Sequence, residues 1–167
     1  MSPPPDGVPD HLLEFLESHG LAIDFMSPGV PMPTVPVAAR AIGVPEDQIL
    51  KTLLFVGDDS DYVVVIVNGT RRVDCTRLAQ AAAIRKPRPA SPADVIAVTG
   101  FPAGGVAPVG LPTSIPVIVD AATAALSFAY GGGEHERLLL RVQISDVIRC
   151  NSAVVADITE RPEQTAV

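Results

Sequence analysis

The strongest constraint on the fold is a pair of β-rich runs that follow one another in the chain. KTLLFVG (51–57) and DYVVVIVNG (61–69) are joined by the short polar segment DDS, a pattern typical of an antiparallel hairpin. Tyr62 to Val67 is apolar without interruption, whereas a strand with one face in water alternates apolar and polar residues. The second strand is therefore predicted to lie at the centre of a sheet that helices cover.

The other predicted elements alternate irregularly between helix and strand. Helices are expected after Asp10, after Thr34, over 76–84, after Ser91-Pro92, over 121–125 and over 145–150, and further strands over 21–26, 115–120, 126–130, 137–142 and 153–158. Hairpins are present and no regular βαβ repeat is visible, which disfavours a doubly wound fold. We expect an α+β fold with a mixed, mainly antiparallel, barrel-like sheet and flanking helices.

The length of 167 residues is typical of one domain, which we place at 9–160. The Pro-rich residues 1–8 are predicted to be a disordered tail and 161–167 a flexible one. No apolar run approaches the roughly 18–20 residues that span a bilayer, and the N-terminus lacks the features of a secretory signal. We therefore expect a cytoplasmic protein with no membrane partner.

The overall charge and the local charge of the chain point to different partners. The formal net charge of −7 argues against a general nucleic-acid binder, DNA included. Six basic residues nevertheless fall between positions 71 and 88, where Asp74 is the only acid: Arg71, Arg72, Arg77, Arg85, Lys86 and Arg88. This segment is either a solvated helix face with its linker or a local patch for tRNA phosphate groups.

The usual catalytic motifs are missing from the sequence. There is no GxSxG, no GxGxxG and no Walker lysine, so neither a serine nucleophile nor a phosphate loop is indicated. Cys75 and Cys150 lie far apart without a CxxC motif, and the chain contains only three histidines. We expect no disulfide, no metal and no cofactor.

Lys51 opens the apolar run LKTLLFV, where a charged residue is unusual. It is either a charge at a strand edge that reaches water or an ammonium at the floor of a pocket, able to hold an anionic or carbonyl oxygen. Its position in the sequence does not decide between these alternatives.

Two glycine-rich segments are the other unusual features. In FPAGGVAPVG (101–110), Gly104 and Gly105 permit positive φ and a close approach of a ligand to the main chain, and Pro108 restricts the geometry that follows. The segment is either a plain turn or a rigid rim of N–H and C=O groups that orients a substrate and a water molecule. Gly131–Gly133 permits the same two interpretations, and His135 beyond it is either a polar pocket group or a surface residue.

In this order the features resemble the YbaK family of aminoacyl-tRNA deacylases, which includes the editing domain inserted in bacterial prolyl-tRNA synthetase. The resemblance runs from about Val35 to Ile158. Its blocks are AARAIGVPEDQILKTLLFV, SPADVIAVTGFPAGGVAPVG, IPVIVD and FAYGGGEHERLLLRVQISDVIRCNSAVVADI. Their order and spacing are far more specific than a single glycine loop.

The resemblance implies roles for individual residues. Lys51 would contact the 3′-terminal adenosine or its phosphate, and Gly104, Gly105 and Pro108, within the family's GxxxP loop, would position the ester carbonyl and the attacking water. Hydrolysis in the family is thought to need no metal and no covalent enzyme intermediate. The residues that would bind the substrate are Thr52, Val106, Ala107, Gly110, Gly131, Gly132, Gly133 and His135.

Two positions depart from the family pattern. Gly131 replaces a common Ser, and Ala107 replaces a common Ser or Thr before the loop proline, so two hydroxyl groups are missing. His135 is a candidate replacement for the first. These changes concern which amino acid is removed more than the type of reaction.

The function implied by the resemblance is hydrolysis of the ester of a mischarged tRNA by a free-standing trans-editing enzyme. The substrate would be tRNA-Pro carrying a small wrong residue such as Ala or Cys, and prolyl-tRNA synthetase is a candidate partner. The alternatives are a binding module that holds tRNA or docks on a synthetase without turnover, and a structural protein with degenerate loops.

Overall fold

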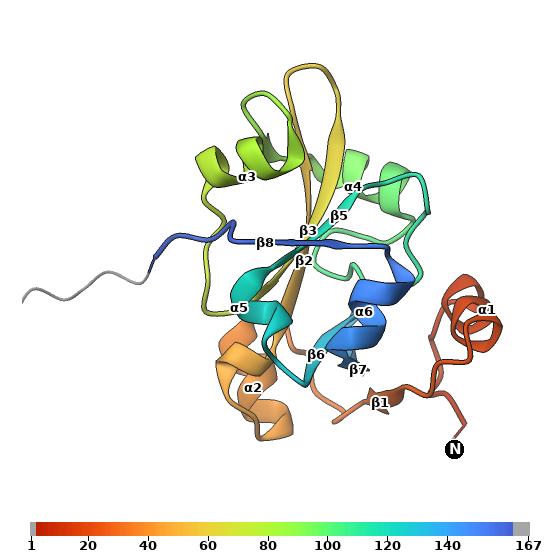
Figure 1. The fold of residues 1–167 in the computed structure, drawn as a ribbon. Coiled ribbons are helices and arrows are strands. Elements are labelled where there is room, and N and C mark those ends of the chain that lie inside the picture. The colour runs from red at the N-terminus through yellow and green to blue at the C-terminus, as the bar shows by residue number, and fades with distance from the viewer. Residues whose placement is uncertain (1–2, 162–167) are drawn as a thin grey trace, which may run out of the picture.

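Two β-sheets with helices packed around them form the part of the chain that the computed structural model describes, residues 3–161 (Figure 1). The elements in chain order are α1 (Asp10–Ser18), β1 (Asp24–Met26), α2 (Val35–Ile42), the 3₁₀ helix η1 (Glu46–Gln48), β2 (Leu50–Val56), β3 (Tyr62–Asn68), α3 (Cys75–Ala82), β4 (Arg88–Pro89), α4 (Pro92–Thr99), β5 (Val117–Asp120), α5 (Ala121–Ala124), β6 (Phe128–Gly133), β7 (His135–Gln143), α6 (Ile144–Cys150) and β8 (Val154–Ala156).

The predicted hairpin forms the middle of the larger sheet. Strands β2 and β3 pair antiparallel with Lys51 opposite Val67, and the sheet has the order β4-β2-β3-β5-β8. Residues 63–67 are at most 1% exposed. Val63, Val65 and Val67 pack in a cluster with Leu78 of α3, and Val64 and Ile66 pack on the other side with Val95 of α4. The prediction of a central strand buried on both faces is confirmed.

The smaller sheet has the order β1-β7-β6, and all of its pairings are antiparallel. In the larger sheet β3–β5 and β5–β8 pair parallel, so a mixed and mainly antiparallel architecture is confirmed. Between the two sheets, the described residues form a single isolated bridge, Ile49 with Tyr130. The predicted barrel-like closure is therefore wrong: the sheets stay separate and open.

Most helix ends follow the expected capping chemistry. The side chains of Thr34, Asp74 and Ser91 accept hydrogen bonds from amides in the first turns of α2, α3 and α4. Helix α2 ends at Gly43 in the left-handed conformation, with φ +72°. Helix α1 differs, because its cap position is Pro9 and Asp10 is the first helical residue without a side-chain capping bond.

The N-terminal segment differs from its prediction. Val8, assigned to a disordered tail, is only 9% exposed and belongs to the main hydrophobic cluster. The burial of its side chain stabilises the approach of the chain to α1. Residues 1–2 and 162–167 lie outside the described residues. No helix within residues 3–161 is long and apolar enough to cross a membrane.

Candidate functional site

Lys51 and the first glycine-rich segment line the same cavity, although more than 50 residues separate them in the sequence. This cavity, the lysine cavity, has a volume of about 320 Å³. Its lining residues are Met32, Pro33, Thr34, Val35, Ala38, Ile49, Leu50, Lys51, Thr52, Leu53, Gly104, Val106, Gly132 and Leu139. The wall is mostly apolar, and Lys51 is its only charged side chain.

Lys51 is half-buried and held in place. Its Nζ donates a hydrogen bond of 2.8 Å to the backbone carbonyl of Arg71, which follows the turn after β3. Burial, and secondarily the positive charge of Arg72, lowers the pKa of Lys51 below its ordinary value. Lys51 therefore lines a pocket and is not a charge at an open strand edge, and its binding of a substrate oxygen stays a prediction. Binding an anion there would compensate its burial.

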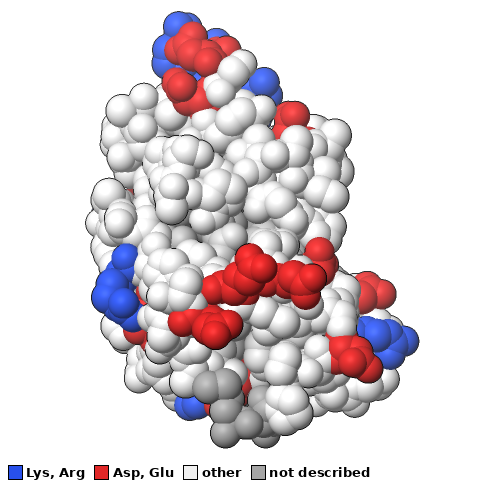
Figure 2. Space-filling view, turned by 90° about the vertical axis from the view of Figure 1, so that its right-hand side faces the viewer, with Lys and Arg blue, Asp and Glu red and all other residues white. Residues whose placement is uncertain are grey.

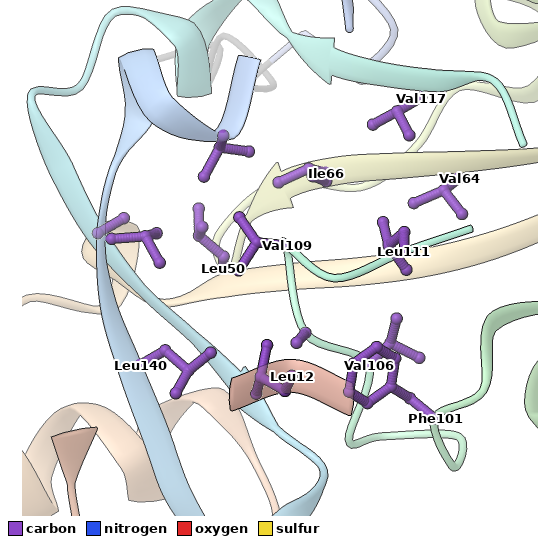
Figure 3. Close-up of a cluster of buried hydrophobic side chains, with 14 of the residues drawn as sticks. Leu12, Leu50, Val64, Ile66, Phe101, Val106, Val109, Leu111, Val117 and Leu140 are labelled. Atoms are coloured by element: carbon purple, nitrogen blue, oxygen red, sulfur yellow. The ribbon is translucent and has the colours of Figure 1, made fainter. Parts of the chain in front are cut away.

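The glycine loop, residues 101–111, is anchored by apolar side chains that point into the core (Figure 3). Phe101 and Ala107 are 0% exposed, and Val109 is 1% exposed. Helix α1 packs against the same loop, since a Cβ at Gly110 would lie 3.1 Å from Leu12 Cδ1. Close packing of this kind gives the loop a single backbone conformation.

Several polar groups at the cavity are free to bind a ligand. Gly104 has φ +81° and is exposed, and Gly104 and Val106 both line the lysine cavity. Among residues 3–161, the amide N–H groups of Gly104 and Val106 have no hydrogen-bond acceptor. Thr52 Oγ1 is buried and also has no partner within this range. Buried polar groups normally have partners, so the amide of the buried Val106 and Thr52 Oγ1 mark a candidate ligand site, whereas the amide of the exposed Gly104 is open to water as well as to a ligand.

A second cavity, the glutamate cavity, continues from the first around Gly104. It has a volume of about 300 Å³ and is lined by Met32, Pro33, Ala103, Gly104, Gly105, Glu134 and Glu136. Met32, Pro33 and Gly104 belong to both linings. The two cavities therefore meet at the glycine loop.

The loop and the tip of the β6–β7 hairpin are joined through their backbones. The amide of Glu134 donates a hydrogen bond of 2.9 Å to the carbonyl of Gly105. A Cβ at Gly105 would overlap the carbonyl group of Glu134. Gly105 is thus required by the close approach of two main chains, and this contact fixes the position of the loop.

The structure brings five of the predicted site residues together in the lysine cavity, namely Lys51, Thr52, Gly104, Val106 and Gly132. Gly105 lines the glutamate cavity. The remaining predicted residues line neither cavity: Ala107, Pro108, Gly110, Gly131, Gly133 and His135. Their direct contact with substrate stays a prediction.

These remaining residues have visible structural neighbours. Ala107 is in the main core cluster, and Pro108 lies against Gly131, where a Cβ would be 2.7 Å from the proline ring. His135 lies beside Gly7, and its Nδ1 accepts a hydrogen bond from the Arg137 amide. The missing hydroxyl at position 107 would therefore point into the core and away from both cavities.

The basic segment is divided by the fold. Arg71 and Arg72 lie next to Lys51, whereas Arg85, Lys86 and Arg88 lie at the opposite end of β2, roughly 17 Å away at 3.4 Å per strand residue. Arg88 pairs with Asp58, and Arg77 pairs with Asp74 and Asp157. At the top of Figure 2, where the β2–β3 turn projects, blue and red side chains are mixed. Only Arg71 and Arg72 are close to the lysine cavity.

The sequence did not indicate several of the lining residues. Met32 to Val35 follow a breaker-rich segment, and their place is set by tertiary contacts, including a hydrogen bond from the Met32 amide to the Glu136 carbonyl. Glu134 and Glu136 were also missed, since an acidic residue in a turn is ordinarily a surface residue. Proximity to the glycine loop is visible only in the folded chain.

Neither cavity offers a conventional nucleophile or metal site. The two linings contain no Cys, Ser or His. Within residues 3–161, no three His, Cys, Asp or Glu side chains are grouped so that they could hold a metal ion. A larger hollow of about 920 Å³ lies near the start of β3 and β5, but it contains none of the predicted site residues.

The fold and this backbone-rich site define a class of protein in which main-chain groups and one lysine surround a small, mostly apolar cavity. A family model described as "Aminoacyl-tRNA editing domain" matches residues 30–150. The chain therefore belongs to the aminoacyl-tRNA editing domain family, and the family resemblance seen in the sequence is confirmed.

Individual relatives agree with this assignment. A protein of Enterococcus faecalis named as a candidate Cys-tRNA(Pro)/Cys-tRNA(Cys) deacylase, EbsC, is 32% identical over 78 residues, which cover 47% of this chain and 48% of that protein. A proline–tRNA ligase of Thermotoga neapolitana is 32% identical over 111 residues, 66% of this chain and 18% of the ligase. The matches thus span about half of the first relative and under a fifth of the second.

The fold has close matches among solved structures. One described as a candidate trans-editing enzyme for prolyl tRNA synthetase superposes with a TM-score of 0.81 at 29% identity, covering 90% of this chain and 96% of that chain. The architecture described above is thus shared with that candidate trans-editing enzyme.

Proposed function

We propose that this chain is a trans-editing aminoacyl-tRNA deacylase, which hydrolyses the ester between a wrong amino acid and the 3′ end of a tRNA. The observation that carries the proposal is the meeting of Lys51 with the free amides of the glycine loop in one cavity. The proposed substrate is tRNA-Pro carrying a small wrong residue, Ala or Cys. The names of the relatives support both the reaction and the tRNA.

In the proposed reaction the backbone of the glycine loop stabilises the transition state. Attack of water on the ester carbonyl places negative charge on the carbonyl oxygen, and the N–H groups of Gly104 and Val106 can donate to that oxygen. One such donor is worth roughly 10²–10³ in rate when it is fixed in advance. The core anchors of the loop, Phe101 and Val109, supply this rigidity.

Lys51 would bind the acceptor end of the tRNA. Lys51 lines the cavity that the loop also lines, and a nucleotide phosphate or ribose oxygen is a suitable partner for a half-buried cation. Arg71 and Arg72 lie next to Lys51 in the folded chain and would contact the adjacent phosphates of the tRNA. The formal net charge of −7 makes it reasonable that a synthetase supplies part of the tRNA affinity in the cytoplasm.

The wall of the lysine cavity suits an apolar aminoacyl side chain, and the preference for a small one is taken from the name of a relative. The wall includes Val35, Ile49 and Leu139, and the cavity measures about 320 Å³. Apolar walls of this kind separate side chains by size only weakly, because one methylene is worth about 1–3 kcal/mol. Rejection of proline would therefore depend on shape as well as on volume.

The test is hydrolysis of a panel of mischarged tRNAs by the wild type, by Lys51→Ala and by Lys86→Ala. Lys86 is the other lysine of the chain and lies at the far end of β2, so Lys86→Ala compares the loss of a remote phosphate contact of the basic segment with the loss of the lysine at the cavity. We expect ester loss with the wild type and with Lys86→Ala, and a reduction of at least tenfold with Lys51→Ala. No turnover of any ester, with tRNA binding retained, would favour the non-catalytic binding module instead.

A further inference from the structure

The two cavities that meet at the glycine loop carry opposite charge. The lysine cavity is lined by Lys51, whose ammonium also donates to the Arg71 carbonyl, and the glutamate cavity is lined by Glu134 and Glu136. Gly104 belongs to both linings and lies between the two charged ends. The groove is therefore positive at one end, negative at the other, and lined by main-chain donors in the middle.

Glu134 is held at this place by its backbone. It occupies the tip of the β6–β7 hairpin with φ +84°, a conformation that favours glycine, and its amide bonds to the Gly105 carbonyl. Glu134 is partly buried and Glu136 is exposed, and among residues 3–161 neither forms an ion pair. The nearest basic residue in sequence, Arg137, donates to the Gly29 carbonyl instead.

An aminoacyl ester of tRNA has the same polarity as this groove. Its nucleotide end carries the negative phosphate, its ester lies in the middle, and its α-amino group is protonated in slightly acidic to neutral solution. With the ester at Gly104, the nucleotide phosphate at Lys51 and the aminoacyl side chain against the apolar wall of the lysine cavity, the glutamate cavity is left to receive the α-ammonium.

We infer that Glu134, with Glu136 beside it, binds the α-ammonium of the substrate and so restricts this protein to esters with a free amino group. The inference rests on the proposed deacylase function and adds a requirement to it. A carboxylate that accepts from an ammonium makes a charge-assisted bond, roughly twice as strong as a neutral one. Esters without the ammonium leave the carboxylate unpaired and are bound less well.

The inference separates Glu134 from a role in the bond-breaking step. An ammonium-binding residue affects only substrates that carry the ammonium, whereas a general base would affect every ester. The two roles can be resolved by comparing alanyl-tRNA with lactyl-tRNA, in which a hydroxyl group replaces the amino group at nearly the same size.

The experiment measures kcat/KM on both esters near pH 6.5, each relative to its uncatalysed rate, for the wild type, Glu134→Gln, Glu136→Gln and the double variant. Glu17→Gln is the charge-matched control, because Glu17 is an exposed carboxylate on α1. We expect the wild type to prefer the alanyl ester about tenfold. We expect Glu134→Gln to lose most of that preference and the double variant to lose all of it, with the lactyl rate unchanged. Glu134→Asp should retain part of it.

The outcomes distinguish this inference from the proposed function. A wild type that hydrolyses neither ester contradicts the deacylase function itself. A wild type that hydrolyses both esters equally well is a deacylase without ammonium recognition, and this result overturns the inference without requiring any variant to fold. Glutamine variants that keep the preference, or that lose both rates together while melting like the wild type, overturn it as well.

Discussion

The two glycine-rich segments, 104–110 and 131–133, look alike in sequence and use glycine for different reasons. In the first, Gly104 has φ +81° and a Cβ added there would meet nothing within 4 Å. In the second segment, a Cβ added at any glycine would lie close to protein atoms. It would be 2.7 Å from the Pro108 ring at Gly131, 3.0 Å from the Val106 carbonyl oxygen at Gly132 and 2.8 Å from the Leu138 side chain at Gly133. The first glycine supplies a backbone conformation, and the others supply space.

Gly105 belongs with the second kind although it lies in the first segment. A side chain there would overlap the Glu134 carbonyl, so Gly105 and the 131–133 segment are the two sides of one contact. At this contact one main chain packs directly on another, which keeps the site rigid although it has no catalytic side chains. It also accounts for Gly131, because in this chain the Pro108 ring occupies the place where a larger residue would begin.

Gly105→Ala is expected to have the largest effect on this contact. The overlap is with backbone, so either the hairpin tip or the loop must move and the Glu134–Gly105 hydrogen bond is lost. We expect a loss of about 3 kcal/mol in the free energy of unfolding. A shift of the loop by about 1 Å would lower deacylation about 100-fold. Urea unfolding and single-turnover hydrolysis measure the two effects, and a variant with wild-type values in both would show that the contact is dispensable.

Gly131→Ala is expected to have an intermediate effect. The added methyl meets the edge of the Pro108 ring, which can shift more easily than a peptide group. We expect about 1–2 kcal/mol of destabilisation and a several-fold loss of activity. Gly57→Ala is the control, since a Cβ there would lie 2.9 Å from the Arg85 carbonyl oxygen, far from the site. It should lose similar stability and no activity; equal activity losses in both variants would mean that Gly131 acts only through stability.

Much of the fold was predictable because it follows from local patterns. The hairpin, the buried strand β3 and the caps at Thr34 and Ser91 follow from apolar runs and capping residues. The tip of the second hairpin was not predicted correctly. The sequence ends the predicted strand at 130 and leaves Gly131 to Gly133 as either a plain turn or a rim of backbone groups, whereas in the structure they continue β6 and the turn is at Glu134. A glycine run gives no local signal for an extended conformation that depends on close packing.

The site was predicted in part. Lys51 and Gly104 were identified through the family resemblance, and the structure places them in one cavity. The wall formed by Met32 to Val35 and the carboxylates at 134 and 136 were not predicted, because their position depends on contacts between distant segments. The two missing hydroxyl groups, at positions 107 and 131, were expected to affect which amino acid is removed. Both positions are packed against other residues of the protein.

Gly104→Ala is expected to have the smallest effect on stability of the three glycine variants. No atom opposes the methyl group, so the cost is that of φ +81° for a residue with a Cβ, about 1 kcal/mol. Gly20→Ala is the control, because Gly20 has φ +63° and equally open surroundings after α1. Asn tolerates the left-handed region better than Ala, so Gly104→Asn should recover part of the stability.

Thermal unfolding and deacylation together test whether conformation alone matters at position 104. If it does, Gly104→Asn should be more stable than Gly104→Ala, and Gly20→Ala should be as stable as Gly104→Ala. Deacylation should then fall only in the two variants at 104, since Gly104 lines both cavities whereas Gly20 lines neither. A loss at Gly104 as large as that at Gly105 would instead assign both glycines to the same steric role.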